Sequence, residues 1–315
     1  MSIKDSSNEQ RSWAETPPTT PAFRSVSGEF ISQQNWLEQV ADPVQKWVQT
    51  FYGGAGSWRI QLKNLLNGTW LGHPVHPMLT DIPLGAWAAT LLLDTIGVFN
   101  DSEDLAEGAD LTLLLGLAGA VGSAAAGITD WSDTEGTDRR VGILHGLLNS
   151  GVTVTNIASY ALRKAGMRRT GVMLSGLSYL VLAYAASLGG ELSYAKGIGV
   201  NHVAWEGGSD DFVAVLAENE LPENKLTRVD AAGIPAVLLR QGKTIYAIAA
   251  TCSHLGGPLD EGTVEDDCVV ACPWHGSRFR MDDGSVMNGP AVYAQPTFAV
   301  RTRNGQIELR RLQHA

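Results

Sequence analysis

Four long apolar segments in the first two thirds of the chain limit the possible folds more than any other feature. They cover roughly residues 78–99, 110–129, 141–162 and 170–190, and each is close to the ~20 residues that a helix needs to cross a hydrocarbon layer. The central stretches of the last three contain no Asp, Glu, Lys or Arg. The second is rich in Gly, Ala and Ser, which favours close contact between helices in lipid. We therefore expect a four-helix transmembrane bundle within residues 70–203.

An even number of spans would place both ends of the chain on the same side of the membrane. Basic residues, which favour the cytoplasmic face, are almost equally divided between the two faces. However, the loop 100–110 carries only acidic charge, and the N-terminal residues show no export signal. Three cysteines cannot build a disulfide framework, which fits a reducing compartment. We expect both ends to be cytoplasmic.

The residues before the bundle fall into two parts. Residues 1–28 are rich in Ser, Thr, Pro, Glu and Gln and hold little apolar surface, so we expect a disordered tail. Residues 29–69 place Trp and Val side chains at helical spacing, with Pro43 expected to bend or divide the helix. These amphipathic helices could lie in the membrane interface or could pack against protein.

Residues 208–315 change to short segments with β character, separated by turn signals such as Gln241-Gly242 and Asn304-Gly305. The pattern predicts a small antiparallel all-β domain. Its expected strands are 212–216, 226–230, 235–239, 244–249, 269–271, 297–301 and 306–310. The predicted fold is thus an α + β multidomain chain, with the four-helix bundle followed by this domain.

Two similar loops in the β region carry the most specific signal. They read Cys252-Ser253-His254-Leu255-Gly256 and Cys272-Pro273-Trp274-His275-Gly276, with seventeen residues between His254 and Cys272. Each loop offers a thiolate and an imidazole, so the two cysteines could bind one iron of a 2Fe-2S cluster and the two histidines the other. The same four ligands could instead hold a single zinc ion. The third cysteine, Cys268, is expected to be a buried strand residue.

The chain resembles the Rieske ferredoxin family across about residues 210–311, which favours the 2Fe-2S cluster over zinc. The resemblance implies that Cys252, Cys272, His254 and His275 are the ligands, with the histidines at an exposed tip. It also implies a surrounding shell that shields the cluster or donates hydrogen bonds to it. That shell consists of Leu255, Gly256, Trp274, Gly276, Ser277, Phe279 and Pro290.

Two features at three positions differ from the respiratory branch of that family. Its extra disulfide cysteines correspond to Gly257 and Trp274 here, and its sulfur-bonding Tyr corresponds to Phe279. Fewer hydrogen bonds to sulfur should lower the reduction potential, so we expect a value near the bottom of the roughly −150 to +300 mV Rieske range.

The first apolar segment begins at His73-Pro74-Val75-His76-Pro77. Residues 70–202 resemble an uncharacterised bacterial family of four-span membrane domains with this motif, which implies a bacterial inner membrane but no activity. We expect His73, His76, His145 and His202 to gather at one membrane face, where they could bind haem b or a quinone or simply cap helix ends. Asp94, toward the opposite face, has no obvious partner.

Together these features predict a membrane-tethered Rieske-type protein that carries single electrons between redox partner proteins. It would have no catalytic iron domain of its own, because only His314 follows His275. The alternatives are a quinol- or haem-linked membrane oxidoreductase and a structural or sensory protein that holds zinc. Membrane lipid is an expected partner. A net charge of -10 excludes nucleic acid as a partner.

Overall fold

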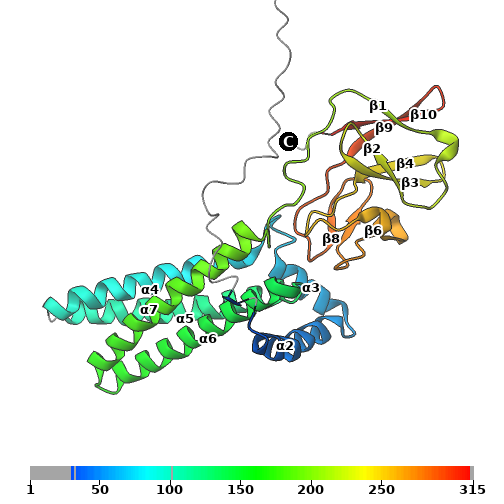
Figure 1. Cartoon of the computed structure of the whole chain (residues 1–315). Helices are drawn as coiled ribbons and strands as arrows, with labels where there is room; N and C mark the ends of the chain where they lie inside the picture. The colour runs from blue at the N-terminus through cyan, green and yellow to red at the C-terminus, as the bar shows by residue number, and fades with distance from the viewer. Residues whose placement is uncertain (1–29, 32, 101, 313–315) are drawn as a thin grey trace, which may run out of the picture.

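The structure is a computed structural model that describes residues 30–31, 33–100 and 102–312. The tail expected at residues 1–28 lies outside the described residues. The chain forms a long helical part followed by a smaller β part (Figure 1). This arrangement confirms the coarse prediction of a helical N-terminal region and a small antiparallel β domain.

Helices α2 (Trp36–Gly53) and α3 (Ser57–Asn67) lie before the bundle. The prediction for Pro43 was wrong in one respect, because α2 continues through it as a single helix. Buried side chains on both sides of Pro43 explain this: Leu37 and Ala41 precede it, and Val48 follows it. The buried face of α2 packs against a cluster on the bundle that includes Trp131, Val141, Ile143 and Leu188. The two alternatives for this segment were a position in the membrane interface and packing against protein. The structure shows that α2 packs against the bundle.

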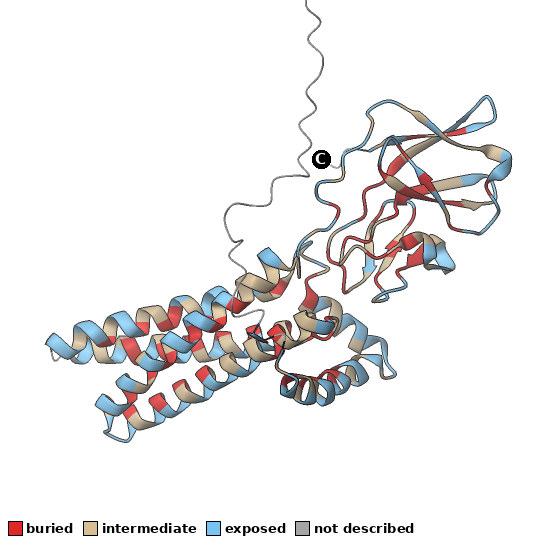
Figure 2. Ribbon diagram, viewed as in Figure 1, coloured by how far each residue is buried: buried red, intermediate tan, exposed pale blue. Residues whose placement is uncertain are grey.

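The bundle contains four long helices: α4 (Val75–Asn100), α5 (Glu103–Trp131), α6 (Gly136–Lys164) and α7 (Arg168–Gly190). A short π-helix, Glu191–Ala195, extends α7. The helices lie side by side as two hairpins (Figure 1). Much of their outer surface is exposed (Figure 2). Large apolar side chains on that surface include Leu92, Phe99, Val121, Met173 and Leu180.

Three of these four helices are long and apolar enough to cross a membrane: α4, α5 and the α7 helix with its extension. The four-span expectation is thus only partly supported. Helix α6 differs because its apolar stretch is interrupted by His145, Asn149, Thr153 and Asn156. These polar side chains lower its hydropathy, although α6 packs along the full hairpin with α7.

The β domain contains three antiparallel sheets. The first has the order β1 (Val213–Ala217), β10 (Gln306–Arg311), β9 (Phe298–Arg303), and the second has β2 (Thr227–Asp230), β3 (Pro235–Gln241), β4 (Thr244–Ala249). The third has β5 (Thr263–Glu265), β6 (Val269–Ala271), β7 (Arg278–Arg280), β8 (Val286–Asn288). The hairpin turns at Gln241-Gly242 and Asn304-Gly305 are present as predicted.

Three strands, β5, β7 and β8, were not predicted. Each has only three residues, too few to show a period of two. Together with β6 they form the sheet whose loops carry the second cysteine–histidine pair. The apolar core beneath them includes Val270, Phe279 and Met281 together with Cys252 and Cys272.

Candidate metal centre

The two loops predicted to form a metal site each connect two strands of the β domain. The first follows β4 and leads to β5, and the second connects β6 to β7. Both cysteines are buried in the same core cluster. The fold therefore brings the two loops together, although their cysteines are twenty residues apart in the sequence.

The two loops have the same backbone hydrogen bonds. The amide of Gly256 donates to the carbonyl of Cys252 at 2.9 Å, and that of Gly276 donates to the carbonyl of Cys272 at 3.1 Å. In addition, the Cys252 amide donates to Gly257 O and the Cys272 amide donates to Ser277 O, both at 2.8 Å. Each of the two five-residue sequences, Cys-x-His-x-Gly in the first loop and Cys-x-x-His-Gly in the second, is therefore a turn closed by the same pair of backbone hydrogen bonds.

Glycine is required in both turns for its backbone conformation. Gly256 has a φ of 79° and Gly276 a φ of 71°, values in the left-handed region that favours glycine. No atom lies within 4 Å of a Cβ built at either position. Gly257 differs, because a Cβ there would lie 2.9 Å from Cys272 Sγ. A side chain at position 257 would therefore collide with the sulfur of Cys272.

The two thiols lie side by side, and backbone amides point at them. Cys252 Sγ receives the amides of His254 and Leu255 and contacts the Cys272 thiol, and Cys272 Sγ receives the amides of Trp274 and His275. The contact with Cys252 lowers the pKa of Cys272 to about 6, and the same contact, together with burial, raises the pKa of Cys252. The pair therefore readily holds one negative charge, and its amides are placed to stabilise more.

The two imidazoles also lie together, at the outer side of the loops. The rings of His254 and His275 have centroids 5.0 Å apart and are nearly perpendicular, at 86°. Burial, with the nearby His275 and Lys63 as further causes, lowers the pKa of His254 to about 3. Neutral imidazole is the form that binds metal. Both rings are half-buried, so the tip is less exposed than predicted.

The predicted shell residues lie around these four side chains with different degrees of burial. Trp274 is 57% exposed and stands beside His275, with ring centroids 6.4 Å apart. Ser277 and Phe279 are fully buried behind Cys272, and Ser277 Oγ accepts a hydrogen bond from the Ala291 amide at 3.0 Å. Leu255 is half-buried and Pro290 is buried. Cys268 lies outside the group, beside Tyr246.

The helical part covers the side of the β domain that carries the histidines. The His202 amide donates to Ser253 O at 3.1 Å, and Asn64 bonds both Asn288 and the Gly289 amide at 3.0 Å. A cleft of about 550 Å³ between the two parts is lined by Trp274 and His275 on one side. The opposite wall is polar and comes from α2, the α5–α6 connection and the start of α6: Gln45, Gln49, Ser132, Asp133, Thr134, Glu135, Gly136 and Arg139.

The structure brings together only two of the four histidines predicted at the membrane face. His76 and His145 have ring centroids 6.3 Å apart. His73 instead contacts its neighbour Pro74 O, and His202 contacts Gly197 O. Ring contact is thus present for His76 and His145, and a cofactor site formed by all four histidines stays a prediction.

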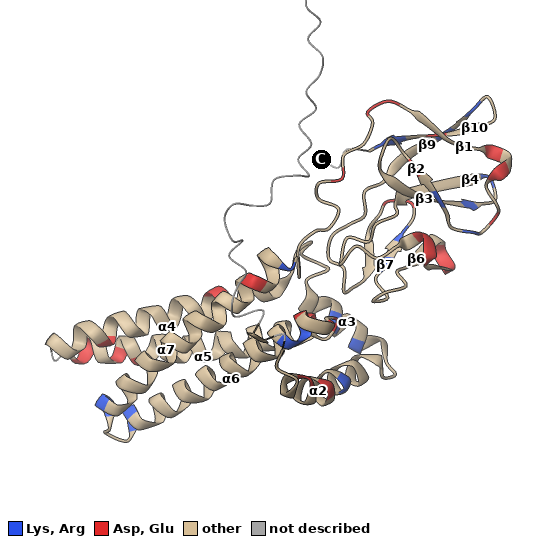
Figure 3. Cartoon of the chain, in the orientation of Figure 1, with Lys and Arg blue, Asp and Glu red and all other residues tan. Residues whose placement is uncertain are grey.

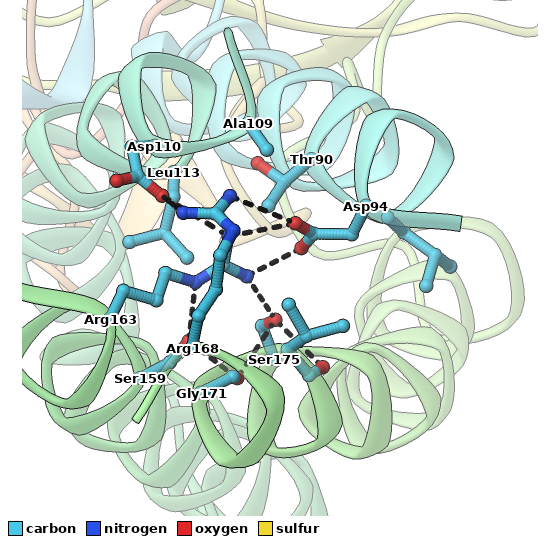
Figure 4. A network of polar contacts seen from close by, with 12 residues as sticks. Thr90, Asp94, Ala109, Asp110, Leu113, Ser159, Arg163, Arg168, Gly171 and Ser175 are labelled. Carbon is cyan, nitrogen blue, oxygen red and sulfur yellow. Dashed lines mark hydrogen bonds and ion pairs between the residues drawn. The ribbon is translucent and has the colours of Figure 1, made fainter. Parts of the chain in front are cut away.

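A buried ionic network at the opposite end of the bundle was missed in the sequence, and the expectation that Asp94 lacks a partner was wrong. Arg163 donates to both carboxylate oxygens of Asp94, at 2.8 and 2.5 Å, and its side chain is fully buried. Asp110, Arg168 and Ser175 complete the network, which joins all four helices (Figure 4). In Figure 3, ribbon segments coloured as acidic and as basic residues lie at this end of the bundle. The available signal was the opposite charge of the two loops there.

Comparison with known proteins assigns both parts of the chain. Residues 211–299 match the Rieske [2Fe-2S] domain, and residues 72–202 match the family described as Predicted membrane protein (DUF2231). The 3-phenylpropionate/cinnamic acid dioxygenase ferredoxin subunit of Escherichia coli (strain K12) is 34% identical over 88 residues, which are 28% of this chain and 82% of that protein. Ferredoxin CarAc of Metapseudomonas resinovorans is 30% identical over 30% of this chain and 90% of its own length.

Among solved structures, the ferredoxin of carbazole 1,9a-dioxygenase from Nocardioides aromaticivorans IC177 is 27% identical, with a TM-score of 0.31 over 31% of this chain and 96% of that chain. The Escherichia coli relative exceeds 30% identity, and the match covers most of its length. Through its C-terminal domain, the chain belongs to the Rieske [2Fe-2S] domain family.

Proposed function

We propose that this protein is a membrane-tethered Rieske-type iron–sulfur protein that carries single electrons, with Cys252 and Cys272 binding one iron and His254 and His275 the other. The observation that carries this proposal is the pairing of like donors. The two thiols contact each other, and the ring centroids of the two imidazoles lie 5.0 Å apart. Two irons with different ligand pairs require this arrangement.

The same donors fit a single zinc ion poorly. A tetrahedral zinc site needs its four donors to converge on one point. Within the described part of the chain, no three His, Cys, Asp or Glu side chains converge in that way. This favours the two-iron cluster implied by the Rieske family over the zinc alternative.

When bound, the 2Fe-2S cluster supplies reversible uptake of one electron. The surrounding residues determine how readily that electron is accepted. Backbone amides of Leu255 and Trp274 at the thiolates favour the more negative, reduced state, because hydrogen bonds to sulfur stabilise added charge. Ser277 is placed to act similarly. Leu255, Phe279 and Pro290 limit the access of water, and Gly256 and Gly276 permit the turns.

The organisation that we propose has a tail at 1–28, amphipathic helices at 29–69, a four-span domain at 70–203 and the Rieske domain at 208–315. Three helices of sufficient length and hydropathy and the match to a membrane-protein family support the membrane assignment. With α6 as the fourth span, both ends lie on the same side. We place the Rieske domain on the cytoplasmic side of a bacterial inner membrane, with lipid around the apolar helix faces.

Redox partners can be proposed by analogy. The Escherichia coli relative named above is the ferredoxin subunit of a 3-phenylpropionate/cinnamic acid dioxygenase. For this chain, one partner would be a separate redox protein. The other would be a second enzyme or the chain's own helical domain, which covers the histidine side of the site. Nucleic acid is not proposed as a partner.

Electron paramagnetic resonance of the dithionite-reduced full-length protein tests the ligand assignment. We expect a Rieske-type signal in the wild type and its loss in His275→Ala, with His314→Ala as the matched control that retains it. Iron and acid-labile sulfide should be present in equal amounts. Zinc without sulfide, or a signal that survives His275→Ala, would contradict the proposal.

A second candidate function is a quinol- or haem-linked membrane oxidoreductase. The observation that favours it is the meeting of His76 and His145 from different helices at the bundle end nearest the β domain. We base this candidate on His76 and His145, whose rings contact each other, and not on His73 and His202, which contact Pro74 O and Gly197 O. Reduction of the Rieske centre by added quinol, absent in His145→Ala, would support the quinol-linked form, and no response in the wild type would exclude it.

A further inference from the structure

The four long helices form two hairpins, and each hairpin contains an equivalent contact between a histidine and a backbone carbonyl. In the first hairpin, His76 of α4 makes a hydrogen bond through Nδ1 to Ser123 O of α5 at 2.9 Å. In the second, His145 of α6 makes one through Nδ1 to Ala185 O of α7 at 2.8 Å. The two histidines therefore occupy equivalent positions.

A glycine lies beneath each ring at the same spacing. Gly127 follows Ser123 by four residues, and Gly189 follows Ala185 by four. A Cβ built on Gly127 would lie 2.7 Å from the His76 ring, and one on Gly189 would lie 3.2 Å from the His145 ring. Both helices thus leave space for an imidazole at the corresponding turn.

The correspondence extends to the other end of the bundle. Asp94 lies eighteen residues after His76, and Arg163 lies eighteen residues after His145. These two residues form an ion pair with each other (Figure 4). When equivalent residues of two repeats contact each other, they lie on the two-fold axis that relates the repeats. Because α4 and α6 run in the same direction, that axis runs along the bundle, as in membrane domains built from parallel repeats.

His76 and His145 meet on the same axis at the end nearer the β domain. Their ring planes are 88° apart, and their centroids are 6.3 Å apart. Since each Nδ1 faces a carbonyl oxygen, Nδ1 carries the proton and Nε2 carries the lone pair. Asn149 agrees with this assignment, because its Nδ2 lies 3.2 Å from His145 Nε2 and can donate to it. Both Nε2 atoms are therefore in the form that binds a metal.

The number of ligands identifies the class of metal centre. No third His, Cys, Asp or Glu joins this pair among the residues that the structure describes. Two imidazoles suffice for an iron that brings its remaining ligands with it, as haem iron does. Metal–imidazole bonds of about 2.0–2.1 Å place two opposed nitrogens roughly 4 Å apart and their ring centroids roughly 6 Å apart. The observed separation fits this arrangement.

We propose that His76 and His145 are the two axial ligands of a haem, held between the two helix hairpins. This inference deepens the second candidate function given above and rests on it. Occupation of the site requires Asn149 to release His145 Nε2. His73 and His202 lie near the same end of the bundle but take no part.

The test uses the full-length protein in detergent, as purified and after titration with haemin. We expect one haem per chain with the absorption and paramagnetic signals of low-spin iron bound by two imidazoles. His76→Ala and His145→Ala should each weaken haemin binding by about 100-fold or more, because even outer partners of metal ligands contribute about 10- to 100-fold. The matched controls His73→Ala and His202→Ala should bind haemin like the wild type. Added imidazole should restore low-spin iron in His145→Gly.

The Rieske signal of the same samples checks folding and separates the two proposals. A wild type that binds no haemin while showing the Rieske signal overturns the haem site alone. The same conclusion follows if both alanine variants bind haemin normally. Loss of the Rieske signal in His275→Ala with haemin binding intact would support a haem site that is separate from the cluster site.

Discussion

Each of the two ligand turns needs a glycine for its backbone conformation and a cysteine and a histidine as metal ligands. Gly256 and Gly276 provide the left-handed conformation, and the cysteines and histidines provide the donors. Because all of these residues lie within two five-residue sequences, the turns could be recognised from the sequence. Gly257 is different, since the reason for a glycine there is the nearby Cys272 Sγ, a contact between separate loops.

Replacement of Gly276 by alanine should destabilise the cluster-binding turn by about 1–2 kcal/mol, the cost of left-handed backbone for an L-residue. The urea concentration that bleaches the cluster absorbance of the full-length protein should fall, and Gly256→Ala should behave alike. Gly257→Ala is the informative comparison, because its methyl group would press on a sulfur and should reduce cluster content even without urea. Equal behaviour of all three variants would argue against these distinct roles.

Replacement of Phe279 by tyrosine should raise the reduction potential. Phe279 is fully buried in the core cluster that contains both cysteines, and a hydroxyl there that reaches a sulfur would stabilise the reduced state. A hydrogen bond of about 1 kcal/mol corresponds to roughly 40 mV for one electron. Ser277→Ala should shift the potential in the opposite direction. A redox titration followed by paramagnetic resonance measures both shifts, and an unchanged potential in both variants would exclude this account.

At the scale of elements, the hairpins of the β domain were predictable and the helix contacts were not. Turn signals and alternating residues determine β3–β4 and β9–β10 locally. Strands of three residues, such as β7, form only because neighbouring strands pair with them. Asp94 and Arg163 are 69 residues apart, so the opposite charge of the two loops at their end of the bundle hints at a contact between helices but does not identify this pair. The covering of His254 and His275 by the helical part could not be predicted for a similar reason, because it depends on contacts between two domains.

Replacement of Asp94 by alanine should destabilise the helical bundle by about 3–5 kcal/mol, because it leaves the buried Arg163 guanidinium without its main partner. Thermal unfolding in detergent should show a lower midpoint. The double variant Asp94→Leu/Arg163→Leu should recover much of the loss, since it removes both buried charges. A single variant as stable as the wild type would show that the pair contributes nothing to holding the helices together.

At the scale of the whole molecule, the β domain is both linked to the helical part and hydrogen-bonded to it. Asn64 makes two of these interdomain bonds, to Asn288 and to the Gly289 amide. Asn64→Ala should therefore weaken the contact by about 1–3 kcal/mol. Amide hydrogen exchange of Gly289 and His202 should become faster, with a smaller effect for Asn288→Ala, which removes one bond. Unchanged exchange in both variants would mean that other contacts hold the domains together.

Seventeen residues separate the end of the last helical segment, Ala195, from the first strand, at Val213. Such a short connection keeps the β domain close to the helical domain even when their hydrogen bonds open. The local concentration of one domain around the other is then roughly millimolar, whatever the abundance of the protein. Electron exchange between the two domains would be first order and insensitive to dilution, whereas a soluble ferredoxin must meet its partner by diffusion.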